Sequence, residues 1–296
     1  MASLKALRQR IRSVTNTRQI TKAMKMVAAA KLRRSQDRAL ATRPYSLQMG
    51  RMVQSIAGRV GKGSAPPLLA GRGEPHKRVE LVLFTADRGL CGNFNSSVIR
   101  AVRAKIAELR AAGFEVSLVC VGRKGHDVLK RQFGGIVRRV HVGMGKGLTF
   151  DRADQEIVQP LLHDFEQERF DSCFMVYNAF VSAMTQTLTW RQIIPVPEPG
   201  ESAQEAEAAG SPPLYEPEEE EILADLLPRN VAVQVFQALV ESDASENGAR
   251  MTAMDNAVRN AGGMLRRLRI TYNRTRQAAI TTELMEIISG SESLKG

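Results

Sequence analysis

The stretch MTAMDNAVRNAGGMLRRLRITYNRTRQAAITTELMEIISG, residues 251–290, decides the fold, because apolar and small residues recur in it at intervals of four and three. This spacing is typical of the seam of a coiled coil, in which one stripe of a helix stays against a partner helix. The stripe runs over four heptads. It consists of Met254, Val258, Ala261, Leu265, Leu268, Tyr272, Thr275, Ala279 and Thr282.

A second stripe of the same kind lies at the start of the chain. It consists of Leu4, Leu7, Ile11 and Val14 and, after a slip, of Ile20, Met24 and Val27. We expect the two stripes to pair with each other, so that the terminal helices form an antiparallel coiled coil. The core of its seam is predicted at Leu7, Ile11, Val14, Val258, Leu265 and Leu268.

Local signals predict where the terminal helices begin and end. The first is expected to start near Ser3 and to reach about Val60, with a kink or a break at Pro44. At the other end, a short helix at 218–226 is expected to stop at Pro228. A long helix then follows from about Asn230 to Ile288.

Between the termini the pattern changes to strands that alternate with helices. Buried strands are predicted at 79–84 and 115–121, a weaker strand at 136–142, and two late strands at 173–178 and 187–194. Helices are predicted at 96–112, 124–133 and 151–169. The alternation indicates an α/β fold with a largely parallel, Rossmann-like sheet, in which the closely spaced last two strands form an antiparallel pair.

Five segments follow from these patterns. They are an N-terminal coiled-coil helix at 1–60, a linker at 61–77, a Rossmann-like domain at 78–195, an acidic Pro-rich loop at 196–221 and a C-terminal coiled-coil helix at 222–296. The loop is expected to be mobile, because Pro, Glu and Ala dominate it.

Charge is distributed unevenly along the chain. Residues 1–60 hold fourteen Lys or Arg against a single acid, Asp37, whereas residues 198–225 hold ten acids and no base. A solvated outer face normally mixes both signs. The basic stretch therefore favours an anionic partner, either nucleic acid or an acidic protein surface.

Several classes of protein are disfavoured. The three cysteines, Cys91, Cys120 and Cys173, are widely spaced within or beside apolar runs, which predicts buried thiols rather than a disulfide framework or a metal site. The sequence has no run of eighteen apolar residues and no apolar leader at its start. We therefore expect a cytosolic chain without a membrane span.

The search for a catalytic site gives no candidate. TADRGLCGNF (85–94) does not complete a dinucleotide fingerprint, and GMGKG (143–147) lacks both the first glycine and the final hydroxyl of a phosphate-binding loop. Tight turns explain both motifs better. His76, His126, His141 and His163 show no metal-ligand spacing. We expect no catalytic residues, no metal and no cofactor.

Three strings resemble those of one known family. IRSVTNTRQITKAMKMVAAAKLRRSQ, TADRGLCGNFN and RMTAMDNAVRNAGGMLRRLRITYNRTRQAAITTELMEIISG are similar, in this order, to the gamma subunit of the F-type ATP synthase. The family usually ends its last motif with Gly-Ala, and this chain has Gly290 followed by Ser291. The chain lacks the cysteine pair of the chloroplast relatives, so their thiol switch is not implied.

The resemblance implies a non-catalytic central-stalk rotor. Proton flow would turn a membrane ring of c subunits, and this chain would turn with it inside the alpha/beta hexamer, beside the epsilon subunit. The implied location is peripheral, at the cytoplasmic face of a bacterial inner membrane. Contacts with beta are implied for Lys22, Met24, Lys25, Lys31, Arg33, Arg34, Arg276 and Gln277. An apolar bearing is implied at Ile280, Leu284 and Ile287.

One alternative remains open at this point, and a second fails for want of a site. A coiled-coil arm that binds RNA or DNA would account for the basic first segment and would show a steep salt dependence, but it leaves the apolar stripe of TTELMEIISG unexplained. An enzyme that uses the central domain would need a site that the sequence does not show.

Overall fold

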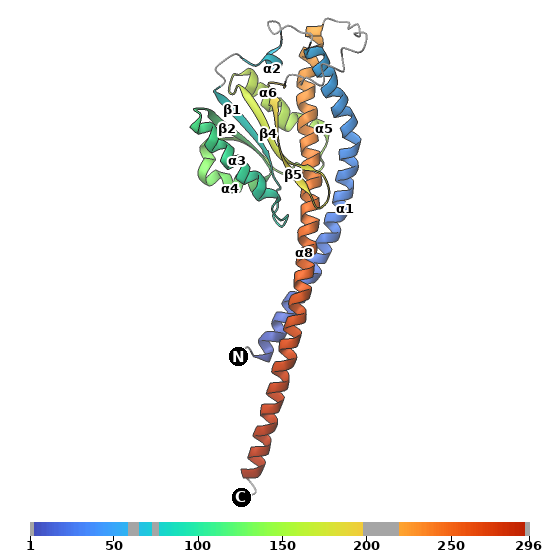
Figure 1. Cartoon of the computed structure of the whole chain (residues 1–296), viewed down its shortest axis with the longest axis vertical. Coiled ribbons are helices and arrows are strands. Elements are labelled where there is room, and N and C mark those ends of the chain that lie inside the picture. The colour runs from blue at the N-terminus through green and yellow to red at the C-terminus, as the bar shows by residue number, and fades with distance from the viewer. Residues whose placement is uncertain (1–2, 59–64, 73–76, 198–218, 294–296) are drawn as a thin grey trace. The chain divides into compact units, whose positions relative to one another are not determined.

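The computed structural model describes residues 3–58, 65–72, 77–197 and 219–293 (Figure 1). The chain divides into two compact units, residues 29–250 and the two terminal segments 1–28 and 251–296. The helices are α1 (Leu4–Ala57), α2 (Pro67–Ala70), α3 (Phe94–Ala111), α4 (Arg123–Phe133), α5 (Phe150–Ala153), α6 (Gln159–Glu166) and α8 (Glu219–Ser293). The strands are β1 (Arg78–Phe84), β2 (Glu115–Val121), β3 (Val137–His141), β4 (Ser172–Phe180) and β5 (Gln186–Ile194).

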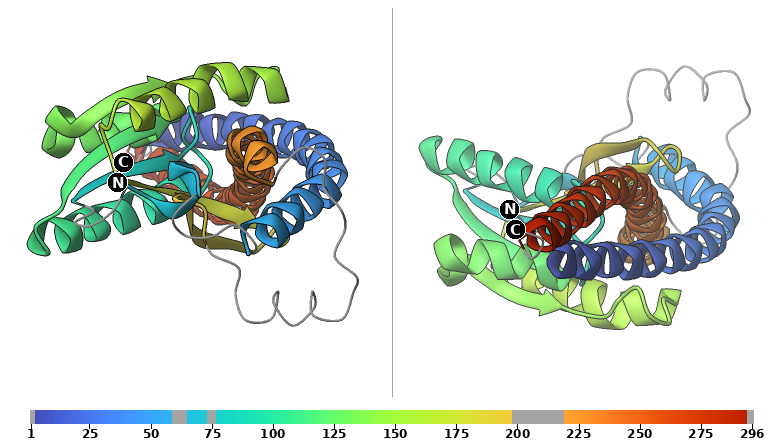
Figure 2. Two further views of the ribbon diagram at one scale, coloured as in Figure 1. Left: turned by 90° about the horizontal axis from the view of Figure 1, so that it is seen from above. Right: turned by 90° about the horizontal axis from the view of Figure 1, so that it is seen from below.

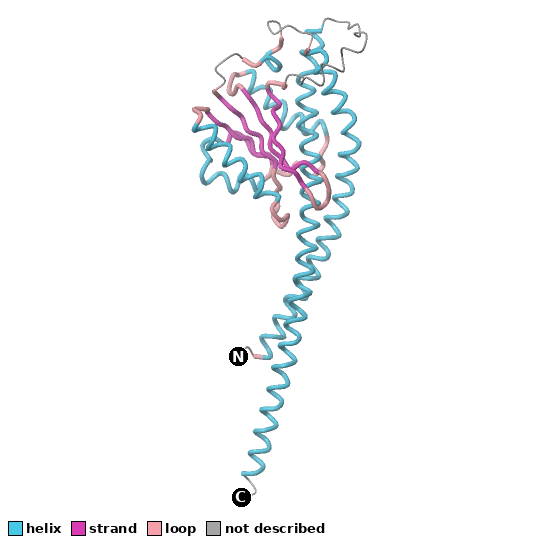
Figure 3. The backbone as a smooth tube through the Cα atoms, in the orientation of Figure 1, coloured by secondary structure: helices cyan, strands magenta, loops and turns pink. Residues whose placement is uncertain are grey.

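The strands of the larger unit form one sheet (Figure 3), and hydrogen bonding gives their order as β3-β2-β1-β4-β5. The first four strands of this order are parallel, and β5 pairs with β4 in the antiparallel sense. The predicted α/β fold is confirmed, and each predicted strand is present within two residues of its expected bounds. Crossover helices impose this arrangement, because parallel neighbours cannot be joined by a tight hairpin.

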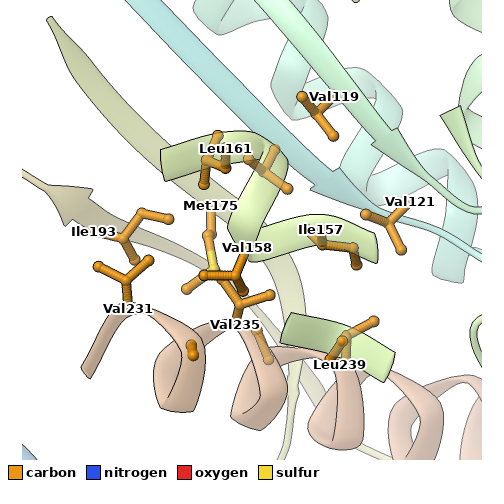
Figure 4. Packing of buried hydrophobic residues seen from close by; sticks show 14 of the residues in the cluster. Val119, Val121, Ile157, Val158, Leu161, Met175, Ile193, Val231, Val235 and Leu239 are labelled. Atoms are coloured by element: carbon orange, nitrogen blue, oxygen red, sulfur yellow. The ribbon is translucent and has the colours of Figure 1, made fainter. Parts of the chain in front are cut away.

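Each face of the sheet carries its own apolar core, and α3 and α6 lie on opposite sides of the strands (Figure 2). Leu81 and Leu83 of β1 pack with α3 and α4, while Val82 and Phe84 point the other way. That second face is covered by the segment from α5 to α6 and by α8, through residues such as Ile157 and Val235 (Figure 4). Alternate residues of one strand thus serve two cores, as a strand buried on both faces requires.

The prediction of one regular helix at 151–169 was only partly right. The segment contains α5, one wide π-helical turn at Asp154–Val158 and α6, in which Pro160 lies in the first turn. Thr149 caps the start, because its hydroxyl accepts a bond from the Arg152 amide at 3.3 Å.

The prediction of a helix end at Pro228 was wrong, because α8 continues through this residue from Glu219 to Ser293. Loss of the proline N–H costs one helical bond, about 3 kcal/mol in a helix interior. Leu223 and Leu227, just before the proline, are fully buried against Met49, Val53 and Ile56 of α1. Burial of one such side chain contributes about 1.5–3 kcal/mol, so packing offsets the lost bond.

Two other boundaries also differ from expectation. Pro44 does not end α1, which runs on to Ala57, and the predicted linker contains the short helix α2. Ser3 does cap α1, because its hydroxyl accepts a bond from the Ala6 amide at 3.3 Å. Most of the acidic loop predicted at 196–221 lies outside the described residues, at 198–218.

The prediction of buried thiols is confirmed for all three cysteines, which are free and buried. Burial raises the pKa of Cys120 to about 12 and raises the pKa of Cys173 as well. Since the thiolate is the reactive form, both side chains are expected to be inert at neutral pH.

A β-bulge in β3 places two arginines beside buried carboxylates. Between Leu118 and Val119 the register of β2 and β3 shifts, so that Arg138 is an extra residue in β3. A bulge re-aims side chains, and both neighbouring arginines bind carboxylates. Arg138 Nε lies 3.5 Å from Glu80 Oε2, and Arg139 Nη2 donates to Asp164 Oδ1 at 3.0 Å.

Glu80 gives a testable pH dependence. Its side chain is buried, Ser117 donates to its Oε2 at 2.5 Å, and its Oε1 has no hydrogen-bond partner among the described residues. Burial raises the pKa of Glu80 above its ordinary value, against the opposing effects of Ser117 and Arg138. The folded state holds the Glu80 proton more tightly than the unfolded state does. The resulting contribution to the unfolding free energy is fully present below the unfolded pKa, about 4.3. It is lost as pH rises through the folded pKa.

We expect Glu80→Gln to keep the bond from Ser117 without a charge to bury. Its unfolding free energy should match wild type near pH 4 and exceed it increasingly at higher pH, by about 1.4 kcal/mol per unit of raised pKa. Urea denaturation over a pH series measures the difference. The control is Glu108→Gln, at a side chain that is 66% exposed. Parallel stability curves for wild type and Glu80→Gln would contradict the prediction.

Candidate functional site

The smaller unit consists of two helical segments that run in opposite directions. Arg8 Nη2 donates to Tyr272 Oη at 3.0 Å, and Lys25 Nζ lies 2.5 Å from Asp255 Oδ1. Between these links α1 advances by 25 − 8 = 17 residues and α8 returns by 272 − 255 = 17. The paired residue numbers add to 280 in both cases, which fixes an antiparallel register without a slip.

The six residues predicted as the core of the seam all lie on the faces that the helices bury. Leu7 and Leu265 are 6% and 5% exposed, and Met254 and Ala261 are also buried. The remaining predicted members, Ile11, Val14, Val258 and Leu268, are half-buried.

The predicted continuation through Ile20 and Val27 was wrong, because these side chains are 60% and 58% exposed. The 3-4 spacing instead continues without a slip from Val14 through Arg18, Thr21 and Lys25 to the buried Ala28. Thr21 and Lys25 are half-buried although they are polar. Hydrophobicity does not mark this part of the seam, because its residues become polar there.

Asp255 explains how the seam accommodates the cation of Lys25. Its carboxylate is bound by Lys25 across the helix pair and lies 3.2 Å from Arg259 on its own helix. The hydrogen bond from Lys25 holds the pKa of Asp255 below its ordinary value. Lys25, expected from the family resemblance to face a partner protein, is thus engaged within the chain, with its side chain 43% exposed.

A second polar contact, between Arg8 and Tyr272, joins the two helices near the start of α1. Besides the hydrogen bond to Tyr272, the Arg8 guanidinium lies over the tyrosine ring, 5.9 Å from its centroid. The same hydrogen bond raises the pKa of Arg8 and lowers that of Tyr272. Sequence reasoning placed Tyr272 on the seam but gave no signal for its arginine partner.

The other candidate contact residues occupy accessible positions. Lys22, Arg276 and Gln277 of the smaller unit are exposed, and Met24 is half-buried. Lys31, Arg33 and Arg34, which belong to the larger unit, are exposed as well.

The end of α8 extends beyond the helix pair. Because paired numbers add to 280, Leu4, the first helical residue of α1, corresponds to 280 − 4 = 276. From Ile280 to Ser291 every side chain is exposed. The predicted bearing residues Ile280, Leu284 and Ile287 are 50%, 53% and 71% exposed.

Two further apolar residues, Met285 and Ile288, are 63% and 48% exposed on the same helical end. They directly follow Leu284 and Ile287 in the sequence, so the apolar composition of this end could have revealed them. Together these side chains form an apolar surface that the described part of the chain leaves uncovered, which is typical of a protein interaction site.

The two glycine-rich motifs are bound to each other through Asp87. Asp87 accepts bonds from the amides of Arg123, at 3.0 Å, and Gly143, at 2.8 Å. Met144, inside GMGKG, is buried in the core. Within the described ranges, no group of three or more His, Cys, Asp or Glu side chains is arranged to hold a metal ion. None of the described helices is long and apolar enough to cross a membrane.

Comparison with known proteins gives consistent matches over the whole chain. A family model described as ATP synthase matches residues 3–294. The ATP synthase gamma chain of Magnetococcus marinus is 59% identical, with 100% of both chains aligned. That of Rhodospirillum rubrum is 52% identical and aligns 99% of this chain with 100% of its own.

Solved structures show the same similarity. A chain from the central stalk and c-ring of Tetrahymena thermophila mitochondrial ATP synthase has a TM-score of 0.60 and 27% identity, covering 80% of this chain and 99% of its own. A chain from Euglena gracilis mitochondrial ATP synthase has a TM-score of 0.69 at 22% identity, covering 98% and 94%, which shows that the fold is shared.

Proposed function

Because this chain belongs to the family of gamma subunits of the F-type ATP synthase, we propose that it is a central-stalk rotor that couples proton flow to ATP synthesis. The observation that carries this proposal is the apolar end of α8, residues 280–291, on a long helix whose preceding part is paired. The described part of the chain leaves this end uncovered. The comparisons give no support to the nucleic-acid-binding alternative.

In this proposal the terminal helices stand inside the hexamer of alternating alpha and beta subunits. The apolar bearing, Ile280, Leu284 and Ile287, would turn within an apolar sleeve. Apolar contacts are not directional, so a rotating tip meets low angular barriers in such a sleeve. Arg276 and Gln277, both exposed, would supply hydrogen bonds to beta at a fixed angle.

The exposed cations Lys22, Lys31, Arg33 and Arg34 would face acidic segments of beta. Exposed ion pairs contribute only about 0–1 kcal/mol each. Such contacts would therefore guide the rotor without holding it at one angle.

The other expected partners are the epsilon subunit and the c-subunit ring, with the complex at the cytoplasmic face of a bacterial inner membrane. We infer that the chain itself is non-catalytic and reaches the membrane only through the ring. The buried thiols, and the hydrogen bonds by which Asp87 holds the amides of Arg123 and Gly143, support a mechanical role for the larger unit.

Coexpression with alpha and beta subunits tests the proposal. We expect a complex with one copy of this chain per hexamer, and aggregation of the chain expressed alone, because its apolar end is then uncovered. The measurement is mass and stoichiometry by native mass spectrometry. A soluble monomer at high concentration that does not enter a complex would contradict a rotor role.

Met24→Lys is expected to impair coupling more than assembly. Met24 is half-buried, and a cation there can form a new ion pair with beta in a partly desolvated gap, where attraction exceeds its surface value. Rotation must break this pair at each step. The variant should hydrolyse ATP with an activation energy raised by more than about 1 kcal/mol, and pump fewer protons per ATP in membrane vesicles.

Met26→Lys is the matched control, because Met26 lies two residues further on and is 59% exposed. An unchanged pumping ratio in Met24→Lys would mean that this helix face does not meet beta. Lys25→Glu does not serve as a test of partner contact, because its carboxylate would be placed against Asp255 within the chain.

A further inference from the structure

A polar segment of α8, residues 242–250, is buried in the larger unit although its sequence, SDASENGAR, reads as an exposed helix face. Ser245 is fully buried, Ser242 and Asn247 are 7% and 4% exposed, and the Arg250 side chain is 14% exposed. Polar side chains are seldom buried without a structural or functional reason.

The elements around this segment come from the carboxyl edge of the sheet. They are the loop 88–91 after β1, the loop 143–147 after β3 and the turn 181–185 between β4 and β5. We call these three loops the collar. In doubly wound sheets this edge is where ligands bind. Here a segment of the chain's own helix lies against it.

Two glycines show how closely the collar approaches the helix. A Cβ added to Gly248 of α8 would lie 3.2 Å from the Ala183 carbonyl oxygen and 3.3 Å from its Cα. A Cβ added to Gly145 would lie 3.3 Å from Asp243 Oδ1. Asp243 in turn accepts the hydroxyl of Ser35 of α1. Backbone of the collar thus meets α8 at the limit of close packing.

Arg250 adds directional bonds to this contact. Its guanidinium pairs with Glu246 one turn earlier and donates Nη2 to the carbonyl oxygens of Arg88, at 3.4 Å, and Gly89, at 3.3 Å. The next residue, Leu90, has a φ of 65°, a strained value for a side chain of this size. A strained residue persists only where its surroundings hold it.

Two of the collar loops are also bound to each other. Asp87 joins the first loop to Gly143 of the second, and Cys91, Ala86 and Phe94 pack with Ala249 of α8. Apolar contacts alone would not fix the rotation of α8 about its own axis, because they are not directional. Hydrogen bonds and close backbone contacts do oppose such rotation, because they can form at only one rotational setting of the helix.

We propose that Arg250 and the collar lock α8 to the sheet against rotation about the helix axis, with Arg250 as the positioning residue. This inference rests on the proposed rotor function. α8 is one continuous helix to Ser293, so torque applied to the larger unit passes at this lock into the helix that follows. The motifs TADRGLCGNF and GMGKG thereby acquire a role as two of the three loops that hold the helix.

Arg250→Ala is compared with Arg259→Ala, which removes another ion pair of the same spacing on α8 but at a side chain that is 70% exposed. In the isolated full chain, we expect amide exchange at residues 88–92 to become at least tenfold faster in Arg250→Ala and to stay unchanged in Arg259→Ala. Equal amide-exchange rates at residues 88–92 in both variants would contradict the proposal.

In the assembled complex, the ratio of protons pumped to ATP hydrolysed should fall at least twofold in Arg250→Ala and recover partly in Arg250→Lys. A lower melting temperature with an unchanged ratio would mean that Arg250 only stabilises the fold, which contradicts the proposal. Gly145→Ala tests the same contact by a second variant, because its added methyl group crowds Asp243 without removing a charge. If the wild-type chain fails to assemble with alpha and beta, the rotor function is contradicted. The amide-exchange comparison in the isolated chain still tests whether Arg250 holds the collar.

Discussion

Leu265→Asp is expected to abolish pairing of the terminal helices and with it assembly of the complex. Leu265 is 5% exposed, and the register of the pair, 280 − 265 = 15, places it opposite Thr15, beside the half-buried Val14. The substitution loses about 2 kcal/mol of apolar burial. It also buries a carboxylate without a partner, which costs several kcal/mol more.

Met264→Asp is the matched control, because this neighbouring side chain is 48% exposed and the charge is the same. Helix content by circular dichroism and yield of the complex after coexpression measure the effect. We expect near wild-type values for Met264→Asp and no complex for Leu265→Asp. Equal yields would mean that the helices do not pair with this face.

Gly122→Ala should prevent the larger unit from folding. Gly122 has a φ of +100°, and a Cβ there would lie 1.9 Å from the carbonyl oxygen of Thr85. This backbone cannot retreat, since the Thr85 amide donates to Val121 at 2.7 Å and the Thr85 hydroxyl accepts from the Gly125 amide at 2.9 Å. An overlap of two backbones must therefore separate β1 from the start of α4.

Gly113→Ala separates overlap from backbone strain. Gly113 also has a positive φ, +84°, but nothing lies within 4 Å of its added Cβ. It should cost only about 1–2 kcal/mol of unfolding free energy. Soluble yield and urea denaturation distinguish the two variants. A folded, soluble Gly122→Ala protein with a similar small loss would show that strands β1 and β2 tolerate a shift at this crossing.

The sequence alone determined the features that local periodicity encodes. Alternation of strands and helices predicted the sheet and its antiparallel last pair, because each element shows its own burial pattern within a few residues. The 4-3 spacing that includes Leu265 predicted the seam for the same reason. The exposed apolar stripe with Ile280 and Leu284 could also be recognised, since a heptad seam does not need it.

Only the tertiary structure decided which distant residues meet. α8 passes Pro228 because Leu223 and Leu227 pack against α1, and the polar seam holds Lys25 because Asp255 lies opposite, 230 residues away in the sequence. The collar likewise brings loops from three strands against residues 243–250 of α8. The local helix or strand propensity of a segment does not depend on such distant partners. Their energy appears only when chain segments far apart in sequence exclude water together, so sequence patterns predicted the elements and packing determined their contacts.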